Sequence, residues 1–199
     1  MLLCIDCGNT NTVFAIWDGT EFTATWRIAT DHRRTADEYF VWLSGLMALK
    51  EMTAQVKEAI ISSTVPRVVF NLRVLCNRYF DCRPIVVGKP ECALPVAPRV
   101  DQGTTVGPDR LVNTVGAHDR HGGDLVVVDF GTATTFDVVD TDGAYIGPSR
   151  GHLFPRWARF IGMPRGYGYG ASMGAWGIDY LAGWAGEHGM VVHCISNYR

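Results

Sequence analysis

Two short stretches of this 199-residue chain place a carboxylate, a glycine and hydroxyl groups at the end of an apolar run. They are Asp6-Cys7-Gly8-Asn9-Thr10 and Asp129-Phe130-Gly131-Thr132. A glycine lets the backbone approach a phosphate closely, N–H and hydroxyl groups donate to phosphate oxygens, and aspartates hold cations. The pattern therefore favours a nucleotide site and phosphoryl transfer, which depends on positioning and charge neutralisation.

A single Asp-Gly turn is more often the end of a β-hairpin than a phosphate site. Two such turns with matched threonine-containing tails reverse that expectation, and they form an internal repeat of strand, turn and strand. The sequence contains neither Gly-x-x-x-x-Gly-Lys-Ser/Thr nor Gly-x-Gly-x-x-Gly. Neither a P-loop nor a Rossmann dinucleotide site is therefore indicated.

The elements that position these turns follow from hydrophobic periodicity and turn residues. The chain is predicted to open with an antiparallel meander of strands at 2–7, 12–17 and 21–28. Thr35 to Glu38 forms a capping box for a helix to about Leu49, and Pro66 suits the first turn of a helix to about Tyr79. The predicted core of the first helix is Phe40, Leu43, Leu46 and Met47. Later predictions are strands at 59–63, 84–87, 124–129 and 134–139, a helix at 109–118 and an irregular connection at 89–105.

Composition and charge limit the class of protein. Hydrophobic residues make up 47% and charged residues 19% of the chain, which indicates a compact globular protein. The formal charge of −2 supplies no positive field for a nucleic acid or an anionic membrane, so neither partner is expected. The N-terminus lacks the basic segment of a signal peptide, and no apolar run approaches the roughly 18 residues of a membrane span. We therefore expect a cytoplasmic protein.

Other residues that could do chemistry have simpler interpretations. The six cysteines are expected to be reduced thiols. Cys4 and Cys7 match C-x-x-C, but residues three apart in a strand face opposite sides, and no second pair has ligand spacing. His118 and His121 are interpreted as surface residues rather than metal ligands. Three arginines could attract anions, although a solvated loop is the preferred interpretation: Arg27, Arg33 and Arg34.

Taken together, the motifs resemble those of type III pantothenate kinase, a family of the acetate and sugar kinase, Hsp70 and actin superfamily. The first phosphate motif of that family is matched by Asp6 to Thr12, and the second by Asp129 to Asp137. The resemblance runs in order from Met1 to about Gly147. Further matches are Arg34 to Tyr39, Ser62 to Pro66 and Val106 to Asn113.

The resemblance implies an α/β actin-like ATPase (ribonuclease-H-like) fold with two domains, at 1–105 and 106–199, each built on a mixed sheet of the five-stranded type. It implies transfer of the ATP γ-phosphate to the primary hydroxyl of pantothenate, the first step of coenzyme A synthesis. It also implies Mg²⁺, a monovalent cation (K⁺ or NH₄⁺) and a homodimer.

Residue roles carry over from the family at matching positions. Asp6 would face Mg²⁺ through water, Thr132 would contact phosphate from the second turn, and Asp129 would bind the monovalent cation. The first ATP loop would comprise Asp6, Cys7, Gly8, Asn9, Thr10, Asn11, Thr12 and Val13.

The resemblance assigns the pantothenate side to another stretch. Asp109 would be the general base, orienting the hydroxyl and taking its proton late. Arg110 could pair with the pantothenate carboxylate through a bidentate fork. The alternative is that Asp109 and Arg110 only stabilise and decorate a helix start. The residues expected to bind pantothenate are Val100, Gly107, Pro108, Asp109 and Arg110.

Two stretches depart from the family pattern. Where the family often has Tyr-Asp-Asn-Pro, this chain has Val100-Asp101-Gln102-Gly103, so Val100 offers only packing. After Gly147 the pattern is lost, and residues 148–199 contain no lysine, three tryptophans and ten glycines. A frameshift, a gene fusion or a degraded gene end is the leading hypothesis, and the second domain is expected to be truncated or atypical. A regulatory nucleotide-binding homologue without catalysis and an inactive fragment are the alternative functions.

Overall fold

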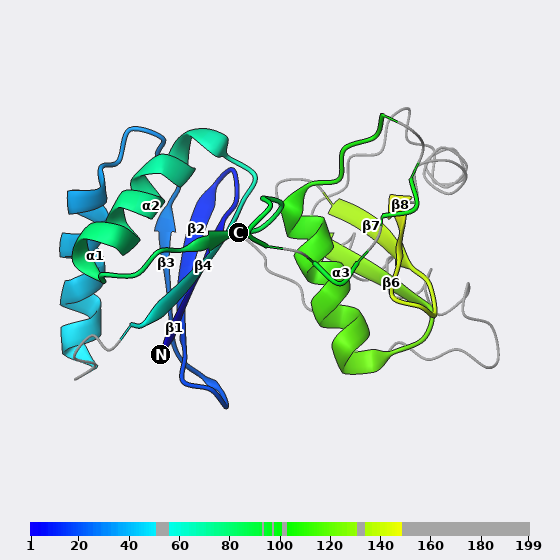
Figure 1. Cartoon of the computed structure of the whole chain (residues 1–199), viewed down its shortest axis with the longest axis horizontal. Coiled ribbons are helices and arrows are strands. Elements are labelled where there is room, and N and C mark those ends of the chain that lie inside the picture. Colours follow the sequence, from blue (N-terminus) through cyan, green and yellow to red (C-terminus); the bar gives the residue numbers. More distant parts are fainter. Residues whose placement is uncertain (51–55, 93, 97, 101–102, 131–133, 149–199) are drawn as a thin grey trace, which may run out of the picture. The chain divides into compact units, whose positions relative to one another are not determined.

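The computed structural model describes residues 1–50, 56–92, 94–96, 98–100, 103–130 and 134–148 (Figure 1). The chain divides into two compact units. The first comprises Met1–Pro95 with Thr105–Asn113, and the second comprises Val96–Thr104 with Thr114–Arg199. The domain boundary expected between residues 105 and 106 stays a prediction.

The first unit is built on a five-stranded mixed sheet in the order β3-β2-β1-β4-β5. β1, β2 and β3 pair antiparallel, whereas β4 pairs parallel with β1 and β5 parallel with β4. This order and these directions are those of a ribonuclease-H-like sheet, so the predicted α/β fold class and the opening meander are confirmed. The strands are β1 (Leu2–Cys7), β2 (Asn11–Trp17), β3 (Phe22–Ala29), β4 (Glu58–Ser63) and β5 (Ile85–Val86).

Two helices connect the strands of this sheet. α1 (Ala36–Leu49) leads from β3 to β4, and α2 (Pro66–Tyr79) leads from β4 to β5. Figure 1 shows both helices on the same side of the sheet. The predicted capping box at Thr35 and Glu38 is confirmed, as is the proline in the first turn of α2.

The core of the first unit lies between the sheet and these helices. Leu3, Ile5 and Cys7 alternate along β1 and are all buried, as expected for a strand with one covered face. The predicted core of α1 is partly wrong. Leu43 and Met47 are buried, but Phe40 and Leu46 are half-buried. Because the buried face repeats every four residues here, Tyr39 takes the place that Phe40 was expected to fill, and it is fully buried.

In the second unit, the two strands of the predicted repeat are present and pair antiparallel, while residues 131–133 between them lie outside the described residues. The described strands of this unit form an antiparallel sheet in the order β6-β7-β8. They are β6 (Leu125–Phe130), β7 (Thr134–Val139) and β8 (Tyr145–Pro148). α3 (Pro108–His121) precedes them, and its first six residues group with the first unit.

Some expectations lie outside the described residues. One is the prediction that Thr132 contacts phosphate. The others are the hypotheses about the origin and conformation of residues 149–199. Within the described part of the chain, no helix is both long and apolar enough to cross a membrane.

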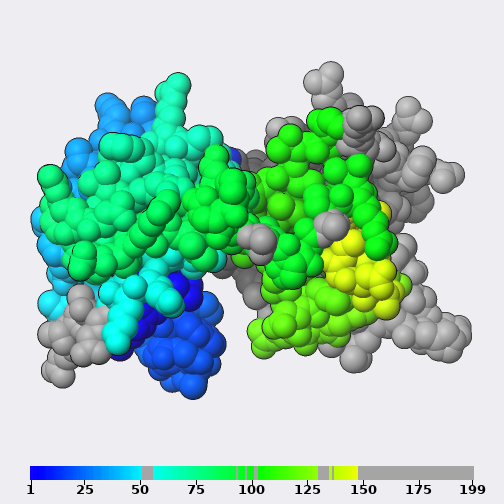
Figure 2. Space-filling view, in the orientation of Figure 1, coloured from blue at the N-terminus to red at the C-terminus, as the bar shows by residue number. Residues whose placement is uncertain are grey.

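Figure 2 shows the surface of the first unit, where the β2–β3 hairpin forms the blue projection at the bottom of the view.

Candidate functional site

The first Asp-x-Gly turn connects β1 to β2 inside the five-stranded sheet. Asp6 pairs with Val13 and Cys7 with Thr12, and the Gly8 N–H donates to the Asn11 carbonyl at 2.9 Å to close the turn. The Asp6, Asn9 and Thr10 residues are exposed. The turn therefore presents a carboxylate, an amide and a hydroxyl group to solvent, which is the donor and acceptor set that a phosphate site needs.

Two of the predicted ATP-loop residues face the interior instead. Cys7 and Thr12 are both 0% exposed, and the Thr12 hydroxyl donates to the Cys7 Sγ at 3.3 Å. Their side chains support the turn from beneath. Strand alternation explains the burial of Thr12, because Thr12 shares a face of β2 with the buried Phe14 and Ile16.

The turn is supported by residues from two other elements. Thr30 follows β3, and its hydroxyl donates to the Gly8 carbonyl at 2.8 Å while its N–H donates to the Thr10 carbonyl at 2.9 Å. Thr64 follows β4, and its N–H donates to the Cys7 carbonyl at 3.0 Å. Sequence reasoning included Thr64 in a matched stretch without giving it a role, and it missed Thr30.

The arginines beside this turn differ from one another. Arg33 is exposed and lies 3.5 Å from the Asp31 carboxylate, as expected for a solvated loop. Arg34 does not fit that expectation. It is half-buried, its guanidinium donates to the Ala29 carbonyl at 2.6 Å, and its Cζ lies 5.4 Å from the centre of the Tyr39 ring. Burial raises the pKa of Tyr39, and the nearby Thr12 hydroxyl and Arg34 charge oppose that rise.

Asp109 lies in the first turn of α3, close to the glycine two residues before it. A Cβ added to Gly107 would lie 2.5 Å from the Asp109 Oδ1, which is closer than real Cβ atoms come to an oxygen. The glycine therefore leaves the space in which the carboxylate lies. Gly107, Pro108, Asp109 and Arg110 are all half-buried. The Leu111 N–H donates to the Gly107 carbonyl at 3.3 Å, so the alternative role of this stretch as a helix start also fits.

The second Asp-x-Gly turn follows β6. Asp129 is half-buried and pairs with Thr135, and Asp137 pairs with Val127. Residues opposite one another in an antiparallel pair share a face, so Asp129 and Asp137 lie on the same face of the sheet. Asp137 is 0% exposed and accepts a hydrogen bond from the Tyr145 hydroxyl at 2.8 Å. Sequence reasoning quoted Asp137 in the motif but gave it no role.

Comparison with known proteins identifies the family of the chain. A family model described as type III pantothenate kinase matches residues 2–149. The chain belongs to the type III pantothenate kinase family.

Curated members of the family are close in sequence. The type III pantothenate kinase of Cereibacter sphaeroides (strain ATCC 17025 / ATH 2.4.3) is 81% identical over 147 residues, which are 74% of this chain and 57% of the relative. That of Paracoccus denitrificans (strain Pd 1222) is 76% identical with the same coverage. The chain therefore spans little more than half the length of the curated relatives it matches.

Solved structures are similar only at a distance. A Ppx/GppA family member from Aquifex aeolicus shares 14% identity, with a TM-score of 0.40, over 74% of this chain and 49% of that chain. The fold class therefore rests on the sheet order and on family membership.

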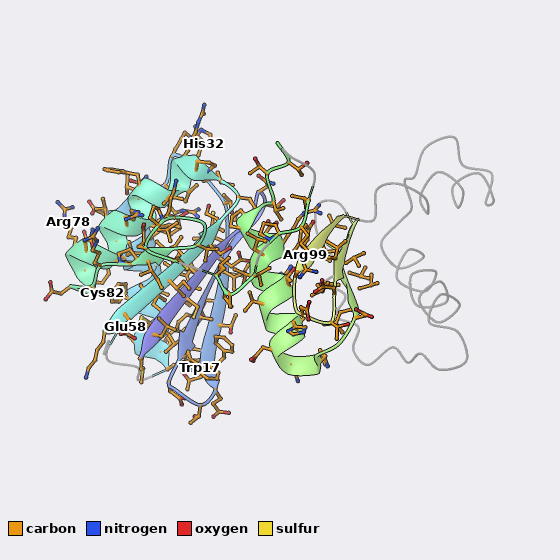
Figure 3. All side chains as sticks on the ribbon, turned by 45° about the vertical axis from the view of Figure 1, so that its right-hand side comes forward. Trp17, His32, Glu58, Arg78, Cys82 and Arg99 are labelled. Atoms are coloured by element: carbon orange, nitrogen blue, oxygen red, sulfur yellow. The ribbon has the colours of Figure 1, made fainter. Side chains whose placement is uncertain are left out.

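Within the family match, Val100 lies beside the β7–β8 hairpin. A Cβ added to Gly147 would lie 3.8 Å from the Val100 Cγ1, so the Val100 side chain lies next to Gly147, and its role on the pantothenate side stays a prediction. Arg99 holds this segment in place, and Figure 3 labels it. Its N–H donates to the Tyr145 carbonyl at 2.7 Å, and its guanidinium pairs with Asp140 at 2.5 Å and Asp142 at 3.4 Å. The sequence offered no signal for Arg99 beyond its place next to Val100.

His118 is not the surface residue that the sequence suggested. It is half-buried, and its Nε2 lies 3.0 Å from the Thr141 carbonyl. A Cβ on Gly143 would lie 2.7 Å from its Nδ1. The imidazole therefore packs between α3 and the β7–β8 turn, whereas His121 is exposed. Among the described residues, no group of three or more His, Cys, Asp and Glu could hold a metal ion.

The described cysteines are free thiols, and Cys4 and Cys7 differ in burial as strand alternation predicts. Burial raises the pKa of Cys4, and it raises that of Cys76 to about 12. A thiol with so high a pKa is a poor nucleophile at neutral pH. Cys76 therefore behaves as a small apolar residue of the core.

Proposed function

We propose that this chain transfers the γ-phosphate of ATP to the primary hydroxyl of pantothenate. The products are ADP and 4'-phosphopantothenate, and the reaction is the first step of coenzyme A synthesis. The observation that carries the proposal is that the family match at 2–149 contains both Asp-x-Gly turns and the start of α3.

The first turn would hold the ATP phosphates. Backbone N–H groups of Asn9 to Asn11 and the exposed Asn9 and Thr10 side chains would supply donors, while the buried Thr12 keeps the backbone in place. Thr132 would donate to phosphate from the second turn.

The cations expected in this family suit the carboxylates present. Asp6 is exposed at the end of β1 and Asp129 is half-buried near the end of β6, and carboxylate oxygens are the hard ligands that Mg²⁺ and K⁺ prefer. Asp6 would hold Mg²⁺ through water, and Asp129 would hold K⁺ or NH₄⁺. Bound there, the cations would neutralise phosphate charge.

Asp109 would act on the hydroxyl of pantothenate. The oxygen–phosphorus bond to the substrate hydroxyl forms as the bond from the γ-phosphorus to the leaving ADP oxygen breaks, and the hydroxyl proton passes to the Asp109 carboxylate. A carboxylate is a weak base towards an alcohol, so its main work is to orient the hydroxyl and take the proton late. Gly107 permits this orientation because any larger side chain would occupy the place of Oδ1.

The remaining contacts complete the substrate side. Arg110 would pair with the pantothenate carboxylate, and Val100 would pack against the substrate. By family resemblance we include a homodimer in the proposal. ATP is a cytoplasmic metabolite, so a cytoplasmic location is also part of it.

The test is ADP release by the purified full chain with ATP, Mg²⁺ and K⁺, with and without pantothenate. We expect pantothenate to stimulate release, and Asp109→Asn to reduce the stimulated rate by about a hundredfold or more, the size of a lost general base. Asp119→Asn is the matched control, because Asp119 is exposed on the same helix.

No stimulation of the unsubstituted chain would refute the proposal, and an ATP-binding measurement would then distinguish a nucleotide-binding homologue from an inactive fragment. Equal rates for the two variants would refute the role of Asp109.

A further inference from the structure

We propose that Thr30 is a positioning residue that fixes the first phosphate turn in its nucleotide-binding shape. The inference rests on the proposed function for its consequence, but the contacts that carry it lie entirely within the first unit. Thr30 is separated from Gly8 by 22 positions in the sequence. The Asp-x-Gly motif therefore does not predict that Thr30 supports the turn.

The contacts form a short chain of hydroxyl groups beneath the turn. The Thr30 hydroxyl donates its proton to the Gly8 carbonyl at 2.8 Å. Its oxygen lies 2.9 Å from the Thr12 Oγ1, and because the Thr12 hydroxyl has a single proton, it donates either to Thr30 or to the Cys7 Sγ. Thr12 is fully buried and also lies 3.3 Å from the Cys7 Sγ. The Thr30 hydroxyl therefore links the Gly8 carbonyl of the turn to the buried Thr12 side chain beneath it.

The direction of these bonds has a consequence for the phosphate site. The Thr30 hydroxyl donates to the Gly8 carbonyl, and the Thr30 N–H donates to the Thr10 carbonyl. A peptide group is planar, so fixing a carbonyl also fixes the N–H of the next residue on its opposite side. The N–H groups of Asn9 and Asn11 are thereby oriented away from Thr30. Thr30 can thus set the donors of the turn without touching the nucleotide.

The test uses the full chain and three variants. Thr30→Val removes the hydroxyl with little change of shape, and Thr30→Ser restores it. Thr23→Val is the matched control, because the Thr23 hydroxyl also donates to a backbone carbonyl of β2, that of Ile16 at 3.3 Å, but at the other end of β3. Figure 3 shows these two ends of the sheet, marked by His32 and Trp17.

Two readouts are measured for each variant. The first is the dissociation constant of MgADP by calorimetry, with the KM values for ATP and pantothenate where turnover is present. We expect Thr30→Val to weaken ADP binding and raise the KM for ATP about five- to tenfold, the effect of one hydrogen bond. The KM for pantothenate should change less than twofold, Thr30→Ser should restore ADP binding, and Thr23→Val should match the unsubstituted chain.

The second readout is the rate at which a thiol reagent labels Cys7, located by peptide mass spectrometry. Cys7 is 0% exposed beneath the turn, so its labelling reports opening of the turn and needs no nucleotide. We expect faster labelling in Thr30→Val only. If the unsubstituted chain binds no ADP, the proposed function fails, and the labelling rate alone decides the role of Thr30. Equal labelling and equal ADP affinity in Thr30→Val and Thr23→Val would overturn the inference, as would a uniform rise in both KM values.

Discussion

The hairpins that carry the two Asp-x-Gly turns share a sequence pattern but differ in burial. In β1, every second residue is buried, and Ile5 is 2% exposed. In β6, residues 125–129 are all half-buried, although the strand is at least as apolar. β1 is the central strand of five and lies under two helices, whereas β6 is an edge strand of the described three-stranded sheet. The local sequence pattern determines which residues form the two strands. The elements that pack against each strand determine how deeply its side chains are buried.

The two hairpins are also held together differently. The first turn is fixed by Thr30 and Thr64, which reach it from the ends of β3 and β4. In the second hairpin, the described supports include the buried hydrogen bond from Tyr145 to Asp137 and the bond from the Thr141 hydroxyl to Asp124.

The difference in burial predicts the largest effect on stability. We expect Ile5→Ala to lower the free energy of unfolding by about 3–4 kcal/mol, because it removes buried methyl groups and leaves a cavity. Val128→Ala, at the corresponding place before Asp129, should cost about 1 kcal/mol because that side chain is only half-buried. Urea denaturation of both variants by circular dichroism checks this. Equal losses would show that the second hairpin is buried as deeply as the first.

A smaller difference in stability is expected between variants of two tyrosine–aspartate hydrogen bonds, Tyr145–Asp137 and Tyr79–Asp37. Tyr145→Phe removes the donor to a carboxylate that is fully buried, and we expect a loss of about 2 kcal/mol in the free energy of unfolding. Tyr79→Phe removes a similar donor to Asp37 at 2.6 Å, but that bond is exposed. Its stacked contact with Phe40 is kept, so the stability should stay nearly unchanged. Thermal unfolding compares the two, and a greater loss in Tyr79→Phe would contradict this assignment.

Local signals accounted for much of the fold. The capping box at Thr35, the proline at Pro66 and the alternation in β1 predicted their elements within a residue or two, because each signal depends on neighbours in the chain. The contacts of Arg34 with Ala29 and Tyr39 are local, but no pattern in the sequence marks them. The contact of His118 with Thr141 was missed because the two residues are distant in sequence. The same reason explains why Thr30 and Arg99 were missed. The two Asp-x-Gly turns were found from residue types and spacing, the pantothenate-side residues through family resemblance, and the residues that support the turns only through the structure.

The smallest expected effect concerns acid and the start of α1 in the first unit. The Thr35 N–H and hydroxyl donate to the Glu38 carboxylate at 2.7 and 2.9 Å, and these bonds lower the pKa of Glu38 in the folded protein. A carboxyl group with a lowered folded pKa contributes stability above its unfolded pKa of about 4.3, and that contribution is lost as pH falls through the folded pKa.

Glu38→Gln should therefore lower the urea midpoint at pH 6 and make it fall less between pH 6 and pH 3. Glu58→Gln, at an exposed glutamate that begins β4, is the control, and it should keep the pH dependence of the unsubstituted chain. If the urea midpoint of Glu38→Gln instead fell as steeply between pH 6 and pH 3 as that of the control, the charge on Glu38 would contribute nothing measurable to the capping box. The helix start would then depend on the Thr35 cap alone, whose bond to the Glu38 N–H at 3.3 Å does not titrate.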